Sequence, residues 1–411
     1  MSSISINSAV PMRWPSAWTD PALLDILKGT PVNCLLNAPS NVADAAKARG
    51  LMAVSRDEAA KSVQFLADPQ WPGVRPRKSS GDGADAGPTG APWVDSNAWA
   101  IQLARALDPS KPVWVEAVPE QGTIQNDAAY QLAAAEPRAF GAQWVVSLDE
   151  ASAKKLAEGD SGLKTRWGRM MDTTRFFVGR PVAAADTVAT LAVISDFAGD
   201  NEFLGKEFLN MAARRNLLYY VAPKRAALTL PSRIATAVLV DEQKPDAALT
   251  AALEKFVRNG GLLIASIGSG AATWGSAAGP AGVPGYTMRA LGKGKIAIPQ
   301  TAWSDPFVMA AEVRILVGRR TDVIRIFNEG MIGVAYAPAP GGGLIHLINY
   351  SRWRSSEQVT IATAETYAKA QATSLEHPSP QEIKVTPRPQ RFCEIPIPAF
   401  AVYSAIDLHR S

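Results

Sequence analysis

The stretch Lys111-Pro112-Val113-Trp114-Val115-Glu116-Ala117-Val118-Pro119 decides how the first part of the chain folds. Its valines and tryptophan favour a short buried strand, and the flanking prolines limit the length of that strand. An amphipathic helix pattern, with a start signal at Asp95-Ser96, runs directly into this stretch. The sequence therefore predicts a parallel strand that carries Glu116 at its carboxyl end.

Similar patterns repeat on both sides of this stretch. Helix patterns alternate with strands that are predicted at 32–37, 51–55, 63–68 and 144–149. Asp68 and Asp149 end two of these strands, as Glu116 ends its own. Residues at the carboxyl ends of parallel strands line the cleft of α/β barrels and open α/β sheets. Asp68, Glu116 and Asp149 are therefore candidate catalytic carboxylates, although acids at such junctions also cap helices or pair with arginines.

The pattern changes near residues 174–186, which indicates a domain boundary. Beyond it, strands of five to nine residues alternate with amphipathic helices, which is typical of a flavodoxin-like parallel sheet. From about residue 286 onward, short strands separated by Gly and Pro predict a small β-sandwich. The predicted fold is α/β, with a short or incomplete (β/α) TIM-like barrel at 1–180, a flavodoxin-like domain at 181–285 and a C-terminal β-sandwich domain at 286–411.

Composition excludes several classes of function. The net charge of +4 is small for 411 residues, and no Lys/Arg cluster alternates with aromatic residues, so we expect no nucleic-acid partner. The first strand of the second domain is not followed by GxGxxG or a P-loop, which disfavours a phosphate site. Three histidines and two distant cysteines, Cys34 and Cys393, predict no metal, no cofactor and no disulfide, but buried free thiols.

No apolar run reaches the ~18 residues that span a bilayer, so we expect no membrane partner. The location of the protein stays open between the cytoplasm and, if a signal peptide was removed, an extracytoplasmic site.

Several segments resemble family 42 β-galactosidases and related glycoside hydrolases. Residues 207–210 and 256–264 are similar to the middle domain of that family, and residues 291–296 are similar to the entry to its last strands. Residues 141–148 are similar to its eighth barrel strand. Val113-Trp114-Val115-Glu116 is similar to the seventh strand, which implies that Glu116 is the nucleophile. The family also carries an Asn-Glu pair as acid/base, but the Asn-Glu pairs of this chain, 201–202 and 328–329, lie outside the barrel region. The resemblance further implies self-association, so we expect a homo-oligomer.

Residues near the predicted strand ends are candidates for binding a carbohydrate. Indole faces stack on sugar rings, although many tryptophans only fill cores. The candidates for substrate binding are Trp14, Trp71, Trp144, Asp95 and Asn97. Residues 77–92 are rich in Gly and Pro, which predicts a long loop that is either a lid or disordered.

Two functions remain open on the sequence. The first is a glycoside hydrolase that cleaves a β-linked oligo- or polysaccharide with two carboxylates, Glu116 as nucleophile and Asp68 or Asp149 beside it. The second is a catalytically silent carbohydrate-binding or assembly protein on the same scaffold. The short barrel and the missing Asn-Glu pair favour the second, and the tryptophan-rich first 150 residues favour the first.

Overall fold

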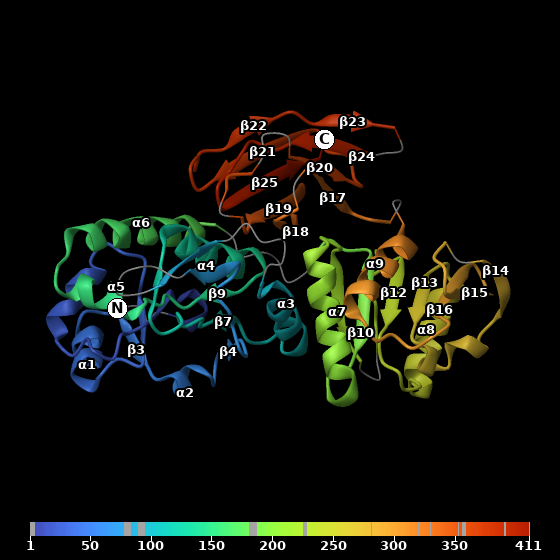
Figure 1. Ribbon diagram of the computed structural model, residues 1–411, viewed down its shortest axis with the longest axis horizontal. Helices are drawn as coiled ribbons and strands as arrows, with labels where there is room; N and C mark the ends of the chain where they lie inside the picture. The colour runs from blue at the N-terminus through green and yellow to red at the C-terminus, as the bar shows by residue number, and fades with distance from the viewer. Residues whose placement is uncertain are drawn as a thin grey trace.

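The computed structural model describes residues 5–77, 84–88, 95–180, 187–224, 228–280, 282–318, 321–328, 330–351, 353–355, 359–389 and 392–410. A barrel-like α/β domain, a flavodoxin-like α/β domain and a β-sandwich follow one another in the chain and pack together (Figure 1). The sandwich lies above the other two domains in this view. Helices α3 (Ala98–Leu107) and α7 (Glu202–Arg214) are in contact where the two α/β domains meet.

Six short parallel strands form the barrel-like domain. They are β1 (Pro11–Arg13), β2 (Cys34–Leu36), β3 (Met52–Val54), β4 (Gln64–Phe65), β7 (Val113–Val115) and β9 (Gln143–Trp144). Two three-stranded sheets, β1-β2-β3 and β4-β7-β9, are joined by a bridge between Met12 of β1 and Val146 just beyond β9. The order around the barrel is therefore β3-β2-β1-β9-β7-β4. Within the described residues, β3 and β4 do not pair, which leaves one seam in a short TIM-like barrel, as expected.

Alternate side chains of these strands point into the barrel and fill it. Cys34, Trp114 and Val145 belong to one buried cluster inside the sheet. Helix α2 (Arg56–Ala59), which links β3 to β4, adds Ala59 to this cluster and so covers the seam. The alternate set, which includes Leu35 of β2, packs against the outer helices. These are η2 (Pro21–Leu27), α1 (Ser40–Ala48), α3, α4 (Asp127–Ala139), α5 (Glu150–Ala157) and α6 (Ser161–Val178).

The ends of the barrel domain carry smaller elements. The N-terminal turn η1 (Ile6–Ser8) contributes Ile6 to the barrel interior. Strands β5 (Val74–Arg77), β6 (Ala84–Pro88) and β8 (Thr123–Gln125) form a separate three-stranded sheet. The predicted loop 77–92 is therefore partly strand, because 84–88 pair with both neighbours. The rest of that loop, 78–83 and 89–92, lies outside the described residues.

The flavodoxin-like domain has a seven-stranded sheet in the order β11-β10-β12-β13-β16-β15-β14. Helices α7 and α9 (Pro306–Val317) cover one face and α8 (Ala247–Arg258) covers the other. The parallel strands are β10 (Leu191–Ser195), β11 (Tyr219–Pro223), β12 (Thr236–Leu239), β13 (Leu262–Ala265) and β16 (Gly294–Pro299). The antiparallel extension is β14 (Ser276–Pro280) and β15 (Tyr286–Leu291). Short 3-10 turns lie at the strand ends: η3 (Gly199–Asn201), η4 (Ile267–Ser269) and η5 (Ala271–Thr273).

The predicted boundary at residue 285 falls inside this sheet, between β14 and β15. β15, β16 and α9 belong to the middle domain and not to the sandwich. Short, glycine-flanked strands look alike in sequence whether they extend a parallel sheet or form a sandwich, so the pattern alone misplaced this boundary.

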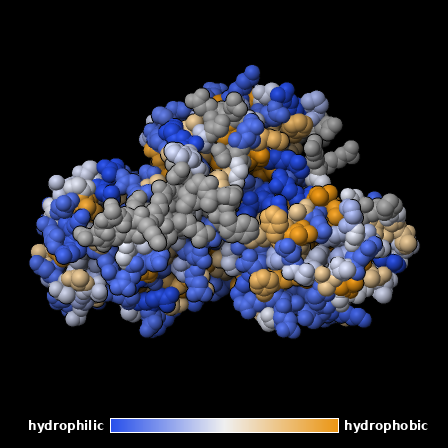
Figure 2. Space-filling model, in the orientation of Figure 1, coloured by the Kyte–Doolittle hydropathy of each residue, from blue (hydrophilic) through white to orange (hydrophobic). Residues whose placement is uncertain are grey.

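Helix α9 is apolar on both its buried and its exposed side. Met309, Ala310 and Val313 pack on the sheet, while Phe307 and Ile315 are 49% and 61% exposed. Figure 2 shows apolar atoms gathered over this helix, with hydrophilic atoms around them.

The C-terminal domain is a sandwich of two antiparallel sheets. One has the order β17-β20-β24-β23, and the other has the order β18-β19-β25-β21-β22. The first contains β17 (Ile324–Phe327), β20 (Thr360–Thr363), β23 (Thr386–Arg388) and β24 (Phe392–Pro396). The second contains β18 (Ile332–Ala339), β19 (Gly342–Asn349), β21 (Lys369–Ser374), β22 (Gln381–Ile383) and β25 (Tyr403–His409). Ile345, Ile361 and Ile395 fill the space between the sheets.

The two cysteines are free and buried, as expected. Burial raises the pKa of the Cys34 thiol to about 12. No helix in the described parts of the chain combines the length and the apolar composition needed to cross a bilayer.

A buried carboxylate, Glu136 of α4, ties the barrel domain to the sandwich. Its oxygens accept hydrogen bonds from the Ser96 hydroxyl at 2.6 Å and the Asn97 side-chain amide at 2.8 Å. They also accept from the Asn97 backbone N–H and from the Tyr350 hydroxyl at 2.7 Å. Tyr350 follows β19, so one side chain joins α4, the start of α3 and the C-terminal domain. Burial raises the pKa of Glu136, although all these hydrogen bonds oppose that shift.

Replacing Glu136 with an apolar residue should strongly destabilise the fold. In Glu136→Leu the buried Asn97 amide and Tyr350 hydroxyl lose their shared acceptor, and so does the partly buried Ser96 hydroxyl. Unmet buried polar groups cost about 1–3 kcal/mol each, so we expect the free energy of unfolding to fall by about 3 kcal/mol. Urea unfolding checks this. Glu158→Leu, at an exposed position, is the control and should change stability by less than about 0.5 kcal/mol. Equal effects would contradict the role of Glu136.

The raised pKa of Glu136 predicts a pH dependence of stability. A carboxyl whose pKa is higher in the folded state favours folding below its unfolded pKa, about 4.3, and loses that contribution as pH rises through the folded pKa. Glu136→Gln removes this titration, and the Ser96 and Tyr350 hydroxyls can rotate to accept from the new amide. The variant should therefore gain stability relative to the unmodified protein as pH rises from 4 to 7. Unfolding curves at several pH values would contradict this if the difference stayed constant.

Candidate active site

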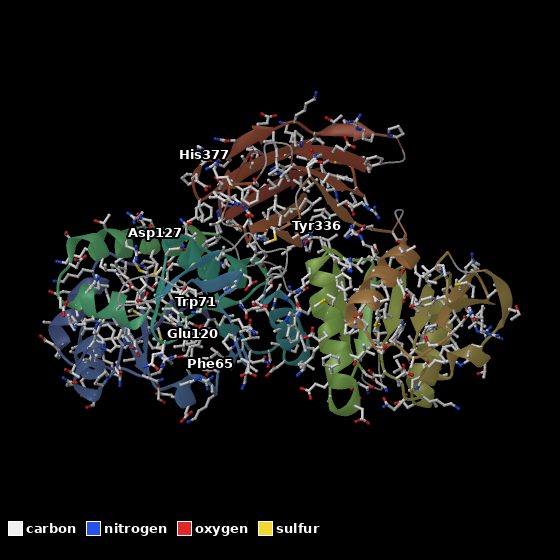
Figure 3. The ribbon with its side chains drawn as sticks, in the orientation of Figure 1. Phe65, Trp71, Glu120, Asp127, Tyr336 and His377 are labelled. Carbon is white, nitrogen blue, oxygen red and sulfur yellow. The ribbon has the colours of Figure 1, made fainter. Side chains whose placement is uncertain are left out.

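The mouth of the barrel brings Glu116, Arg56 and Phe65 together. Trp114 points into the barrel, so Glu116, two residues further along, points to the same side at the carboxyl end of β7. Arg56 Nε lies 3.0 Å from Glu116 Oε2. The Arg56 guanidinium stacks 4.3 Å from the centre of the ring of Phe65, which is labelled in Figure 3. The Glu116 side chain is 9% exposed and that of Arg56 is 49% exposed. The carboxylate is thus fixed by one guanidinium that itself faces solvent.

Neighbouring strand ends complete this mouth. Arg13 of β1 pairs in register with Leu36, which points inward, so Arg13 lies on the inner face at the end of β1, one strand beyond β9. Asn37 follows β2 with a φ of 57°, a conformation that asparagine tolerates well. Its side-chain oxygen accepts a hydrogen bond from the Arg56 backbone N–H at 2.8 Å. Asn37 therefore fixes the start of α2, and with it the arginine that holds Glu116.

Asp149 has a structural set of partners. It is the N-cap of α5, where it accepts from the Ser152 backbone N–H and hydroxyl, both at 2.8 Å. It also accepts from the Tyr130 hydroxyl at 2.9 Å and the Gln125 backbone N–H at 3.1 Å. The residue is 2% exposed. These four hydrogen bonds use both carboxylate oxygens, so the structure places Asp149 in the packing between α4 and α5.

Asp68 lies beyond β4, the strand that pairs directly with β7. It is exposed and has a φ of 46°. It lines a cleft of about 590 Å³ between the barrel domain and α7 of the middle domain. The walls of this cleft also include Gln64, Phe65, Trp99, Glu207, Asn210 and Arg214. Of the predicted residues, the structure therefore brings Asp68, Asp95 and Asn97 to one cleft.

A chain of polar contacts forms the α7 side of this cleft. Arg214 Nη2 lies 3.7 Å from Asp95 Oδ1, and Arg214 Nε donates to Asn210 Oδ1 at 3.0 Å. Asn210 in turn donates to Glu207 at 3.3 Å. Asp95 thus faces the middle domain. Asn97 is 4% exposed, bonded to Glu136 and to the backbone of Gln70, so it shapes the cleft wall from within.

The predicted tryptophans lie in the core. Trp14 and Trp144 are each 2% exposed and Trp71 is 8% exposed, and all three pack between the sheet and the outer helices. Trp71 and Trp144 are neighbours, with ring centres 6.3 Å apart. Trp14 donates its indole N–H to the Trp18 carbonyl. Trp144 occupies an outward-facing position of β9, which meets the helix layer, while Trp14 directly follows β1 and Trp71 lies between β4 and β5.

Sequence reasoning missed the residues that complete the site. Arg56 directly follows the predicted strand 51–55, so its position at a strand end could have marked it as a candidate site residue. Phe65 lies on a predicted strand. Glu207, Asn210 and Trp99 carry no such signal, because their position depends on how α7 packs beside α3. Across the described residues, no cluster of three or more His, Cys, Asp or Glu side chains could hold a metal ion.

Comparisons with solved structures identify the fold. An α-L-fucosidase, isoenzyme 2 from Paenibacillus thiaminolyticus, matches with a TM-score of 0.55 and 11% identity over 90% of this chain and 70% of its own. A β-galactosidase from Bacillus circulans sp. alkalophilus matches with a TM-score of 0.52 and 11% identity over 75% of this chain and 57% of its own. A family 42 β-galactosidase from G. stearothermophilus matches at 0.50 with 12% identity, over 77% of this chain and 57% of its own.

The fold is thus that of glycoside hydrolases with a TIM-like barrel. In particular it resembles family 42 β-galactosidases, and the chain spans 57% of the length of the two that are named here. No protein-family model and no curated protein matches the sequence.

The buried position of Trp14 predicts a structural role. Truncating a buried tryptophan to alanine costs about 3–5 kcal/mol, so Trp14→Ala should lower the free energy of unfolding by that amount. Trp353, which is 62% exposed, is the control, and Trp353→Ala should cost less than about 0.5 kcal/mol. Chemical denaturation measures both. A stable Trp14→Ala protein that had lost only sugar binding would show that Trp14 contacts ligand.

Proposed function

We propose that the protein is a glycoside hydrolase with Glu116 as its nucleophile. The observation that carries this proposal is the position of Glu116 on the inner face of the barrel mouth, held by Arg56. A glycosidase nucleophile must be a carboxylate aimed at one point of the sugar ring, and a bound guanidinium restricts its orientation. The fold supports the same conclusion, since the similar solved structures are a fucosidase and β-galactosidases.

Asp68 is the proposed acid/base. In the register of β4 and β7, Phe65 pairs with Trp114, so Ala67 falls opposite Glu116 and Asp68 follows it. The two carboxyl groups of a retaining glycosidase lie ~5–5.5 Å apart, so this role requires the Asp68 side chain to turn toward Glu116 from the position beside its register partner. Asp149, with four hydrogen bonds, is proposed to position α5 and Tyr130 and not to take part in proton transfer.

The cleft beside Asp68 is the proposed binding site for the rest of the carbohydrate. Its volume of about 590 Å³ lies within the ~300–1,000 Å³ of typical ligand sites. Its walls combine aromatic rings, Phe65 and Trp99, with amides and carboxylates that can bond to hydroxyl groups. We expect a β-linked oligosaccharide to extend from the mouth along α7.

A carbohydrate-binding protein without activity is the second candidate. The specific observation in its favour is that Glu116 is ion-paired and only 9% exposed, while Asp149 is fully used as a helix cap. A six-stranded barrel also has fewer strand ends to supply an acid/base. Binding of an oligosaccharide without release of any product would support this candidate.

Glu116→Gln tests the hydrolase proposal. The change keeps the shape of the side chain but removes its nucleophilic oxygen, so kcat should fall at least about 10³-fold, as when a nucleophile is lost. Hydrolysis of 4-nitrophenyl β-D-galactoside, α-L-fucoside and related glycosides measures this. Folding should change little, since Arg56, the charged partner left behind, is 49% exposed and stays in contact with water.

Glu120→Gln is the matched control, because Glu120 lies four residues further along and is exposed. It should keep full activity. Full activity in Glu116→Gln would contradict the assignment of Glu116 as the nucleophile. Absence of turnover by the unmodified protein, together with oligosaccharide binding in calorimetry, would select the second candidate.

A further inference from the structure

The exposed side of helix α9 carries an apolar stripe. Val308, Ala311 and Ile315 recur at i, i+3 and i+7, so they lie along one side of the helix. Val308 is 46% exposed, and Phe307 and Ile315 are more exposed still. The opposite side of α9 is buried on the sheet of the middle domain. Soluble monomers rarely leave a continuous apolar surface open to water, so this stripe marks an interaction surface.

The charged residues of α9 are engaged by neighbouring elements of the same chain. Glu312 accepts a hydrogen bond from the Tyr286 hydroxyl of β15 at 2.9 Å. Arg314 donates to the Arg215 carbonyl at the end of α7. The guanidinium of Arg215 in turn stacks 4.2 Å from the centre of the Phe307 ring. The stripe is therefore left apolar between these charges.

The C-terminal end of the stripe borders a groove. The volume of this groove is about 460 Å³, and Ile315 and Leu316 form part of its wall. The remaining wall comes mainly from β14, β15 and the start of β16, where glycines leave room and Met288 adds an apolar side chain. Lys293 and Lys295 also line the groove and are exposed. This end of the surface is thus a partly apolar recess with positive charge.

The N-terminal end of the stripe has the opposite character. Phe307 and Val308 are exposed there, and the exposed Asp305 precedes them as the N-cap of α9. This end lies about 15 Å along the helix from Ile315. Apolar side chains with an acid at one end face a recess with two lysines at the other when a second copy is turned end for end. The surface is therefore complementary to itself in shape and in charge.

We propose that α9 forms a two-fold interface between two copies of this chain. The two helices pack antiparallel and cross at Ala311, whose small side chain permits a close approach. Phe307 and Val308 of each copy lie against the groove of the other, and Asp305 faces the lysines of that groove. Another protein could cover the stripe only by supplying both a recess and an acid, and this chain already supplies both.

Sedimentation velocity of the full chain tests this interface. A contact of one helix and one groove is small, so we expect a dimer with a Kd in the micromolar range. Ile315→Glu places a charge in each half of the contact and should raise the Kd at least about 30-fold. Phe203→Glu is the control, because Phe203 is 67% exposed but lies about 18 Å along α7 from Arg215. It should leave the Kd unchanged.

Disulfide trapping tests the two-fold geometry. A residue on a two-fold axis meets its own copy, so oxidation should cross-link Ala311→Cys into a dimer. Ser304→Cys is the matched control, because it lies before the N-terminal end of α9, away from the axis, and should stay uncross-linked. The natural thiols of Cys34 and Cys393 are buried and should not react.

Three outcomes would overturn the proposal. These are a protein that stays monomeric across micromolar concentrations, a trimer in place of a dimer, and a dimer that Ile315→Glu leaves intact. A monomer that instead co-sediments with phospholipid vesicles would overturn it too, since the stripe would then cover itself with lipid. Neither assay involves a carbohydrate, so the result is independent of the proposed hydrolase activity.

Discussion

The structure depends on one buried carboxylate, that of Glu136. An ionisable group is rarely placed in the core unless several donors surround it, and here the donors come from three separate segments. Ser96 and Asn97 start α3, which forms one wall of the interdomain cleft, and Tyr350 belongs to the sandwich. The cleft wall and the C-terminal domain are thus held by the same carboxylate. The position of the candidate site relative to the rest of the molecule follows from this contact.

The small number of strands explains why the barrel is open to solvent only at its mouth. Six strands enclose a narrow space, and side chains such as Trp114 fill it completely below the level of Glu116. A ligand can therefore approach Glu116 only from the carboxyl ends of the strands. The cleft against α7 begins at Phe65, whose ring stacks on Arg56, so polar groups of the middle domain lie next to the mouth.

The sequence predicted the order of the three domains and the strand that carries Glu116, because period-two and helical patterns report directly on local structure. It also predicted Asp68 at the end of a strand, which in the structure ends three residues earlier, at Phe65. It could not place Trp14 or Trp144, since a buried ring and a sugar-stacking ring have the same local sequence. Nor could it distinguish Asp149 from Glu116: both end strands, and only the tertiary partners, Ser152 and Tyr130 in one case and Arg56 in the other, separate their roles.

The seam between β3 and β4 affects how the barrel moves. Neighbouring parallel strands normally share a ladder of backbone hydrogen bonds. Between β3 and β4 that ladder is missing, and a single turn of helix, α2, covers the gap. Local opening requires the least free energy where the fewest backbone hydrogen bonds must break. The barrel is therefore expected to open locally at the seam first. Arg56 is the first residue of that turn. Each opening would carry the guanidinium away from Glu116, so the electrostatic environment of the candidate nucleophile would fluctuate with the barrel itself.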